Sequence, residues 1–223
     1  MSKKSREIWE ELRSVTSGKT LDALLPPLVF VIGNAIFGLD VAIWLALSLA
    51  ALLTILRLIR KQPWKYAFGG LLAVGLAVGL AYVNRNATSY FLPAIISSGL
   101  ILILVLITLL MGKPLAAWAS HLTRGWPLAW FWLPNVKPAY REVTWMWTLF
   151  FGMRLAVQVI LYQRGDVTTL AWANTLLGWP VTVIVLVLSY IYGIWRLRKL
   201  GGPGVDEFIE DKPAPWKGQT RGF

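Results

Sequence analysis

The stretch TWMWTLFFGMRLAVQVILYQR, residues 144–164, decides the fold, because it is an apolar segment with one arginine near its middle. As an α-helix it would rise about 1.5 Å per residue, which places Arg154 about 14 Å from Trp145 and about 15 Å from Arg164. The hydrocarbon core of a bilayer is about 30 Å thick, so Arg154 would lie near its midplane. A guanidinium there costs about 3 kcal/mol or more, so the segment predicts a transmembrane helix whose arginine has polar partners.

The composition of the whole chain favours a membrane protein. Of the 223 residues, 57% are hydrophobic and only 15% are charged, which is too apolar for an ordinary soluble domain. The net charge of +11 comes from lysines and arginines in the gaps between apolar runs, a distribution that argues against a nucleic-acid partner. Cysteine is absent, which excludes disulfides and thiolate chemistry.

Outward from residues 144–164, the chain predicts an all-α fold, a polytopic membrane helical bundle with six transmembrane helices. The expected spans are 21–37, 41–59, 66–82, 90–111, 144–163 and 170–194. They make up one membrane domain, 21–198, which includes a tryptophan-rich cytoplasmic loop at 112–142.

The two ends of the chain are expected to lie outside this domain. Residues 1–20 predict a cytoplasmic amphipathic segment with a helix at 6–15, which lies either in the membrane interface or against the protein's own cytoplasmic loops. Residues 199–223 are rich in glycine, proline and mixed charge, and predict a flexible cytoplasmic tail. The first apolar run reads as an uncleaved span.

Lysine and arginine gather at both ends of the chain and in the second and fourth loops, and are scarce in the other loops. The positive-inside rule then places both termini in the cytoplasm of a multi-pass protein.

Arg154 selects its partners by depth. Gln158 lies one helical turn away, Asn34 and Asn174 lie at similar depth on other spans, and Pro180 frees the carbonyl near Leu176. These residues form a candidate intramembrane polar cluster. The cluster is either purely structural or also binds an anionic group, and a third alternative pairs Arg154 with Asp40 at an outer turn.

Two further residue sets suggest packing roles. Small residues in the third span would let helices approach closely, and the expected packing positions are Gly69, Ala73, Gly75, Ala77 and Gly79. Tryptophans in the 112–142 loop would anchor it at headgroup level, and the expected interfacial anchors are Trp118, Trp126, Trp130 and Trp132.

No group of residues suggests catalysis or a cofactor. The acids lie at turns and ends, and neither a metal-binding motif nor a phosphate loop is present. His121, the one histidine, reads as a packed side chain rather than a metal ligand. We expect no catalytic residue, no metal and no cofactor.

Four short motifs carry a family resemblance: LPPLVFV at 25–31, FLPAI at 91–95, GKPL at 112–115 and MRLAVQ at 153–158. In this order and spacing the chain resembles the bacterial membrane-protein family known as domain of unknown function 3159, over about residues 21–198. More distantly it is similar to the intracellular septation protein A family. The first resemblance implies a protein of the bacterial plasma membrane, and the second implies work on the cell envelope.

We therefore expect a non-enzymatic integral membrane protein that organises the envelope by binding lipids, other membrane proteins or a second copy of itself. A small transporter or channel with an anion at the Arg154 cluster is the alternative. A membrane enzyme is the least favoured class, because catalytic groups are missing.

Overall fold

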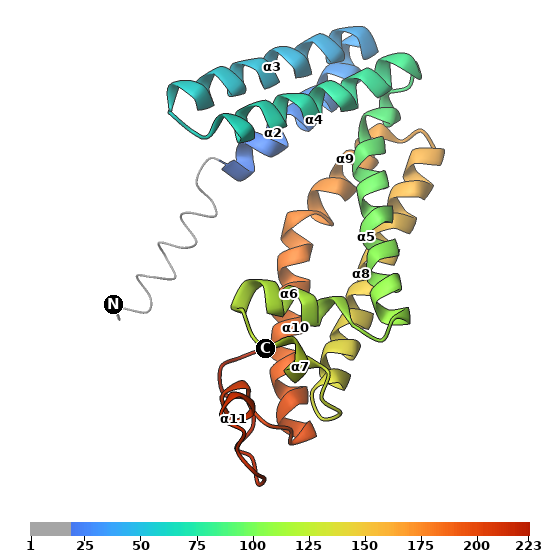
Figure 1. The fold of residues 1–223 in the computed structure, drawn as a ribbon. Coiled ribbons are helices and arrows are strands. Elements are labelled where there is room, and N and C mark those ends of the chain that lie inside the picture. The colour runs from blue at the N-terminus through green and yellow to red at the C-terminus, as the bar shows by residue number, and fades with distance from the viewer. Residues whose placement is uncertain (1–18) are drawn as a thin grey trace, which may run out of the picture. The chain divides into compact units, whose positions relative to one another are not determined.

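The structure, a computed structural model, describes residues 19–223, with side chains from Leu25 onward except that of Tyr66 (Figure 1). All of the secondary structure in this range is helical, which confirms the all-α class. The described residues form two compact units: unit 1 comprises those up to Ala94 together with Gln158–Thr175, and unit 2 comprises Ile95–Val157 and Leu176–Phe223. The sequence predicts one membrane domain over 21–198, whereas the structure divides this range between the two units. The helix expected at 6–15 lies outside the described residues.

Unit 1 is built on three helices, α2 (Lys19–Phe37), α3 (Leu39–Ile59) and α4 (Trp64–Val83). Gly38 alone joins α2 to α3, and its φ of 84° favours glycine because a Cβ would be strained there. A Cβ on Gly33 would lie 3.2 Å from the Cα of Ala42, so glycine also lets these two helices approach closely.

The core of unit 1 extends beyond these three helices. The 3₁₀ helix η1 (Ala87–Phe91) places Tyr90 on Phe30, with stacked ring centroids 4.2 Å apart. The short helix α9 (Val167–Leu176) adds Leu170, which is fully buried. Apolar burial of this kind holds the unit together.

Unit 2 contains most of α5 (Leu92–Leu110) and of α8 (Lys137–Gln163), with α6 (Leu115–Arg124), α7 (Leu128–Phe131), α10 (Trp179–Leu200) and α11 (Val205–Ile209). Prolines set the starts of the short helices, since Pro114 precedes α6 and Pro127 precedes α7. The hydroxyl of Thr144 on α8 accepts from the backbone N–H of Ala116 at 3.2 Å, so it satisfies a free donor at the start of α6.

Aromatic side chains fill the core of unit 2. Trp130, Phe131 and Tyr140 are each fully buried and meet edge to face, with centroid distances of 4.9–6.0 Å. The sequence predicts Trp126 and Trp130 as interfacial anchors, whereas the structure buries both. Trp118 and Trp132 are half-buried, with centroids 6.1 Å apart.

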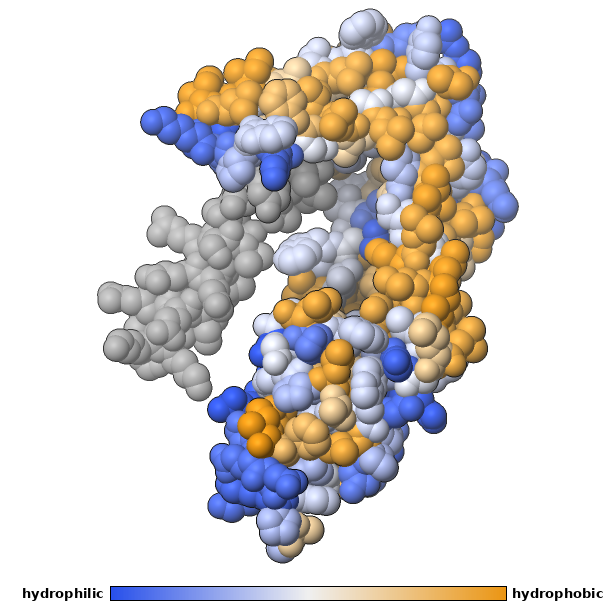
Figure 2. All heavy atoms as spheres, viewed as in Figure 1, coloured by the Kyte–Doolittle hydropathy of each residue, from blue (hydrophilic) through white to orange (hydrophobic). Residues whose placement is uncertain are grey.

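Four helical segments among the described residues are long and apolar enough to cross a membrane: Leu39–Ile59, Ala87–Leu110 (η1 with α5), Lys137–Gln163 and Val167–Leu200 (α9 with α10). The apolar parts of the other two expected spans, Leu25–Phe37 and Ala67–Val83, are shorter than the usual ~20 residues. The expected count of six spans is thus not confirmed, but the helices indicate a membrane protein. Figure 2 shows the apolar side chains along α5 on the outside.

The sixth expected span is interrupted. Helix α9 ends at Leu176 and α10 begins at Trp179, so Pro180 lies in the first turn of α10 and not inside a helix. Proline is tolerated there because its missing N–H would have no partner in the helix. The hydroxyl of Thr182 donates to the carbonyl of Gly178 at 2.6 Å and occupies one acceptor at the break.

The tail at 199–223, which the sequence predicts to be flexible, is part of unit 2 and packs against its other helices. Val205 is fully buried, and the ring of Phe223 stacks on Tyr140 with centroids 4.2 Å apart. The carboxylate of Glu207 accepts three backbone N–H groups, from Gly204 at 2.8 Å, Lys217 at 2.7 Å and Gly218 at 3.1 Å. Composition alone does not predict this folded tail. One carboxylate holds the loop through backbone N–H groups, and every sequence has such groups.

The loop closed by Glu207 is expected to open in acid. Hydrogen bonds, first from Gly204 and then from Lys217, hold the pKa of Glu207 below its ordinary value of 4.5. A lowered folded-state pKa means that its contribution is fully present above pH ~4.5 and is lost as the pH falls through the lowered value. A fluorophore on a cysteine at exposed Thr220 should therefore keep a constant anisotropy from pH 8 to about 5 and lose anisotropy in stronger acid.

The Glu207→Gln variant is the control for the other carboxylates of the tail. It should show low anisotropy at neutral pH and a flatter pH profile. Identical profiles for the variant and the parent protein would contradict the role given to Glu207.

Candidate functional site

The predicted polar cluster is only partly assembled. The amide of Gln158 donates to Asn174 Oδ1 at 2.7 Å, and Asn174 Nδ2 donates to the carbonyl of Leu170 at 2.9 Å. Gln158 is fully buried, so this pair is a tie between α8 and α9 inside unit 1. None of the hydrogen bonds described for residues 19–223 joins Asn34 to the pair.

Arg154 lies on α8 in the part that belongs to unit 2, and its side chain is half-buried. Its Nε atom is buried and has no hydrogen-bond partner among the residues that the structure describes. The alternative pairing with Asp40 is not seen, because Asp40 accepts from Arg85 Nη1 at 3.2 Å at an exposed turn. A buried guanidinium N–H without an acceptor is costly, so Arg154 is a candidate site for an anion.

Unit 1 contains a groove between its three main helices. It has a volume of about 170 Å³ and is lined by Pro26 of α2, by Ala50, Leu53, Thr54 and Arg57 of α3, and by Gly70, Ala73 and Val74 of α4. We name it the Arg57 groove. All of its lining side chains are apolar or small except those of Thr54 and Arg57, so the groove is mainly apolar and has one cationic residue in its lining.

Thr54 and Gly70 shape this groove. The hydroxyl of Thr54 donates to the carbonyl of Ala50 at 2.8 Å and lies 3.3 Å from the carbonyl of Ala67, which links α3 to α4. A Cβ on Gly70 would lie 3.1 Å from Arg57 Nη1, so the guanidinium lies directly over the bare backbone of this glycine. A larger residue at 70 would displace it.

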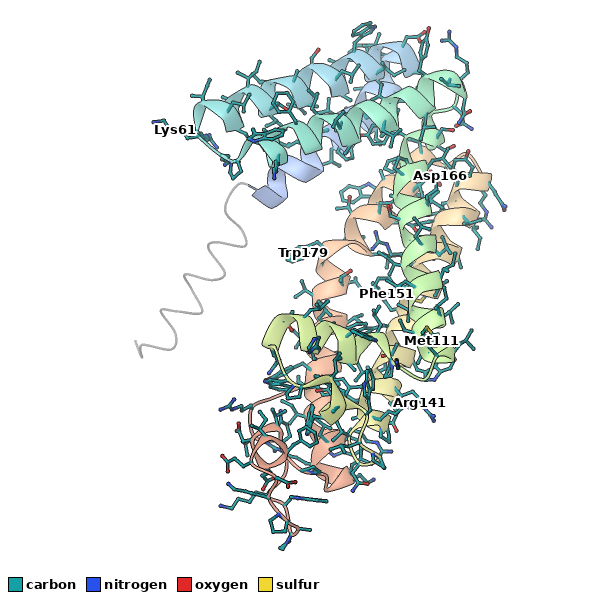
Figure 3. All side chains as sticks on the ribbon, in the orientation of Figure 1. Lys61, Met111, Arg141, Phe151, Asp166 and Trp179 are labelled. Atoms are coloured by element: carbon teal, nitrogen blue, oxygen red, sulfur yellow. The ribbon has the colours of Figure 1, made fainter. Side chains whose placement is uncertain are left out.

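Further basic residues lie in the turn between α3 and α4, the two helices that form most of the groove. Arg60, Lys61 and Lys65 are exposed in or beside the α3–α4 turn, and Lys61 lies at its tip (Figure 3). Trp64 is 64% exposed beside them. A cluster of cations with an exposed tryptophan is typical of a helix end at the level of anionic lipid headgroups.

The glycines of α4 differ in their surroundings. Ala77 is buried in the core of unit 1, and Ala73 lines the Arg57 groove. A Cβ on Gly69, Gly75 or Gly79 would meet nothing within 4 Å, so within the described structure these glycines make no close helix contact. The predicted stripe is therefore part core and part open surface.

No group of three or more metal-ligating side chains occurs within residues 19–223. His121 Nδ1 lies 2.6 Å from the carbonyl oxygen of Trp126, and its ring meets Trp118 edge on with centroids 6.3 Å apart. The histidine is thus packed, as the sequence predicts.

The ion pair between Glu142 and Arg196 in unit 2 is not predicted from the sequence. Glu142 Oε2 accepts from Arg196 Nε and from Tyr192 at 2.7 Å each, and Oε1 accepts from Arg196 Nη2 at 2.8 Å. A bidentate pair of this kind fixes α8 against α10. The signal available in the sequence was an acid near the end of one span with an arginine near the end of another, but Arg141 beside Glu142 obscured it.

The comparisons with known proteins support one family. Residues 17–198, more than half of the chain, match the family described as Protein of unknown function (DUF3159). No curated protein and no solved structure matches the chain, so the distant similarity to the septation protein A family is not shown. The four motifs quoted above all lie within the matched residues, and the chain therefore belongs to the DUF3159 family.

Proposed function

We propose that this protein is a non-enzymatic, multi-pass protein of the bacterial plasma membrane that binds an anionic lipid headgroup in the Arg57 groove. The single observation that carries the proposal is that Arg57 Nη1 lies beside Gly70 in a groove whose other lining residues, apart from Thr54, are apolar or small. A guanidinium has five N–H donors, so Arg57 can bind a phosphate alongside the interaction that it already makes within the chain. An apolar groove suits the start of an acyl chain.

The surroundings of the groove support a lipid over a soluble anion. The outer faces of α3 and α4 are apolar, with Ile55, Leu72 and Leu76 each more than half exposed. In water these side chains would form an aggregation-prone patch, whereas in a bilayer they meet acyl chains. The cations of the α3–α4 turn add attraction for a negatively charged membrane surface, about 1 kcal/mol for each Lys or Arg near it.

The same proposal includes six spans with both termini in the cytoplasm. The two shorter apolar helices can complete spans by local thinning of the bilayer and by flanking residues that reach the interface. The basic α3–α4 turn then faces the cytoplasm under the positive-inside rule. Other membrane proteins, or a second copy of this chain, are proposed partners for the open face of α4 at Gly69, Gly75 and Gly79.

The test is lipid retention by the purified full chain in nanodiscs that contain phosphatidylglycerol and phosphatidylcholine. Native mass spectrometry should find phosphatidylglycerol on the parent protein, and Arg57→Gln should reduce its retention about tenfold, since it removes one charged hydrogen-bonding group. Gly70→Leu should have a similar effect because the leucine would fill the groove.

Arg60→Gln is the matched control, because Arg60 is exposed in the same turn and does not line the groove. It should lower retention by less than about twofold, as expected for one screened surface charge. Equal losses for Arg57→Gln and Arg60→Gln would leave only a diffuse basic surface, and unchanged retention in Arg57→Gln would remove the site.

A second candidate function, a small anion transporter or channel, rests on the buried Nε atom of Arg154 without a partner among the described residues. If it holds, liposomes that contain the protein should release a trapped anion and Arg154→Leu should abolish the release. If the lipid-binding proposal alone holds, the parent protein and Arg154→Leu should both retain the anion.

A further inference from the structure

The last residues of the chain occupy a preformed slot in unit 2. The ring of Phe223 is only 7% exposed and lies nearly parallel to Tyr140, at an interplanar angle of 12°. The ring also lies against Gly193 of α10, where a Cβ would overlap it. We name the space between Tyr140 and Gly193 the aromatic slot.

The walls of the aromatic slot have contacts other than those with Phe223. Tyr140 is fully buried and also packs edge to face against Phe131 and Trp130. Gly193 belongs to the regular helix α10. Because both walls have these other contacts, we expect the slot to persist when the ring leaves it.

Residues beside the slot recognise the backbone that precedes the ring. Arg124 Nη1 donates to the carbonyl of Arg221 at 2.9 Å, and its guanidinium lies over Trp126 at 4.7 Å. Gly222 has a φ of 98°, and a Cβ there would overlap the hydroxyl of Tyr190 and lie 3.1 Å from Arg124 Nη1. The site therefore contacts three successive features of the segment: the backbone carbonyl of Arg221, the glycine at 222 and the aromatic ring of Phe223.

The segment that fills the slot, residues 203–223, makes most of its other polar contacts within itself. Glu207 holds Lys217 and Gly218, the N–H of Val205 donates to Gln219 at 3.1 Å, and Arg221 pairs with Asp206 at 2.9 Å. Its hydrogen bonds to the helices, among those described, are Trp130 to Pro203 at one end and Arg124 to Arg221 at the other. The end near Phe223 can therefore detach while the Pro203 end stays anchored.

We propose that the aromatic slot is a peptide-binding site for a segment in which a glycine precedes an aromatic residue, and that the chain's own Phe223 occupies it in this structure as a releasable latch. The site lies in unit 2 and is independent of the lipid proposed at Arg57. A tethered occupant has a high effective concentration, so a free peptide binds well only when the latch is removed.

The probe is a fluorescein-labelled peptide of residues 214–223, and the protein is the full chain in nanodiscs with empty nanodiscs as the blank. The Phe223→Ala protein should bind the peptide at least about tenfold more tightly than the parent protein. Peptides with alanine in place of the glycine or the phenylalanine of the Gly222–Phe223 pair should lose at least about tenfold in affinity.

Glycine-to-alanine substitutions supply matched variants. In the Phe223→Ala background, Gly193→Ala should abolish peptide binding because its Cβ fills the slot, although alanine suits a helix better than glycine. Gly152→Ala is the control, since a Cβ at this helical glycine meets nothing within 4 Å. It should bind the peptide as the Phe223→Ala protein does.

A second measurement keeps the proposal testable if a double variant fails to fold. In the otherwise unchanged chain, Gly193→Ala should lower the anisotropy of a fluorophore at position 220, and Gly152→Ala should not. Equal peptide binding by the parent and Phe223→Ala proteins, or unchanged anisotropy in Gly193→Ala, would overturn the proposal.

Discussion

Trp130→Ala is expected to destabilise unit 2 by about 3–5 kcal/mol, the cost typical of truncating a buried aromatic side chain. Trp130 is fully buried, meets Trp126, Phe131 and Tyr140 edge to face, and donates from Nε1 to the carbonyl of Pro203 at 2.9 Å. The substitution leaves both a cavity and an acceptor without its donor. Chemical unfolding in detergent micelles, followed by near-ultraviolet circular dichroism, measures the loss.

Trp145→Ala is the control, because Trp145 lies on α8 and is 54% exposed. In micelles it should change the free energy of unfolding by less than about 1 kcal/mol, as surface substitutions usually do. Similar losses for Trp130→Ala and Trp145→Ala would contradict the assignment of the 112–142 tryptophans to a packed core.

Glu142→Leu is expected to cost about 2 kcal/mol and to loosen α8 from α10. The carboxylate is 32% exposed and Arg196 is 25% exposed, so the pair is partly screened and is worth less than a fully buried one. The substitution leaves Arg196 and the hydroxyl of Tyr192 without their acceptor. A double-mutant cycle with Arg196→Leu, using the same unfolding assay, isolates the pair energy.

The neighbouring Arg141, which is exposed, provides the matched control. Arg141→Leu should leave the unfolding free energy nearly unchanged. Additive losses in the Glu142–Arg196 cycle would show that the two side chains do not couple, and would contradict the role of this pair.

The all-helical class and the positions of most helices could be predicted because they depend on local patterns. The apolar run at 144–163 lies within α8, and the turns at Gly38 and Gly165 have the positive φ that favours glycine. Helix α6 could be predicted from the period of Leu115, Trp118 and Leu122.

The contents of the core and the fold of the tail could not be predicted, because they depend on contacts between distant residues. Tryptophan is enriched both at membrane interfaces and in aromatic cores, so composition did not distinguish the two for Trp126 and Trp130. In the tail, burial of Val205 and Phe223 against residues far away in the chain outweighs a composition typical of disorder.

The sequence predicts a polar cluster with an arginine, but it does not predict where the candidate sites lie. Depth along the helices placed Gln158 and Asn174 in one cluster with Arg154 and Asn34, and the structure joins only Gln158 to Asn174 among the described hydrogen bonds. Depth gives no direction around the helix axis, so it did not exclude Asn34 or the alternative partner Asp40. The Arg57 groove depends on Gly70 facing α3 across a turn, and this register follows only from the packed structure.

Burial of the helices in lipid is the claim on which the account rests, and single-cysteine labelling tests it most directly because the chain has no native cysteine. Cysteines would be placed at Leu104, half exposed on α5, at Lys61 in the α3–α4 turn and at Asp166 in the turn after α8, in sealed membrane vesicles. An impermeant maleimide should label positions 61 and 166 from opposite sides of the membrane, and position 104 only after detergent is added. Labelling of position 104 in intact vesicles would contradict the account.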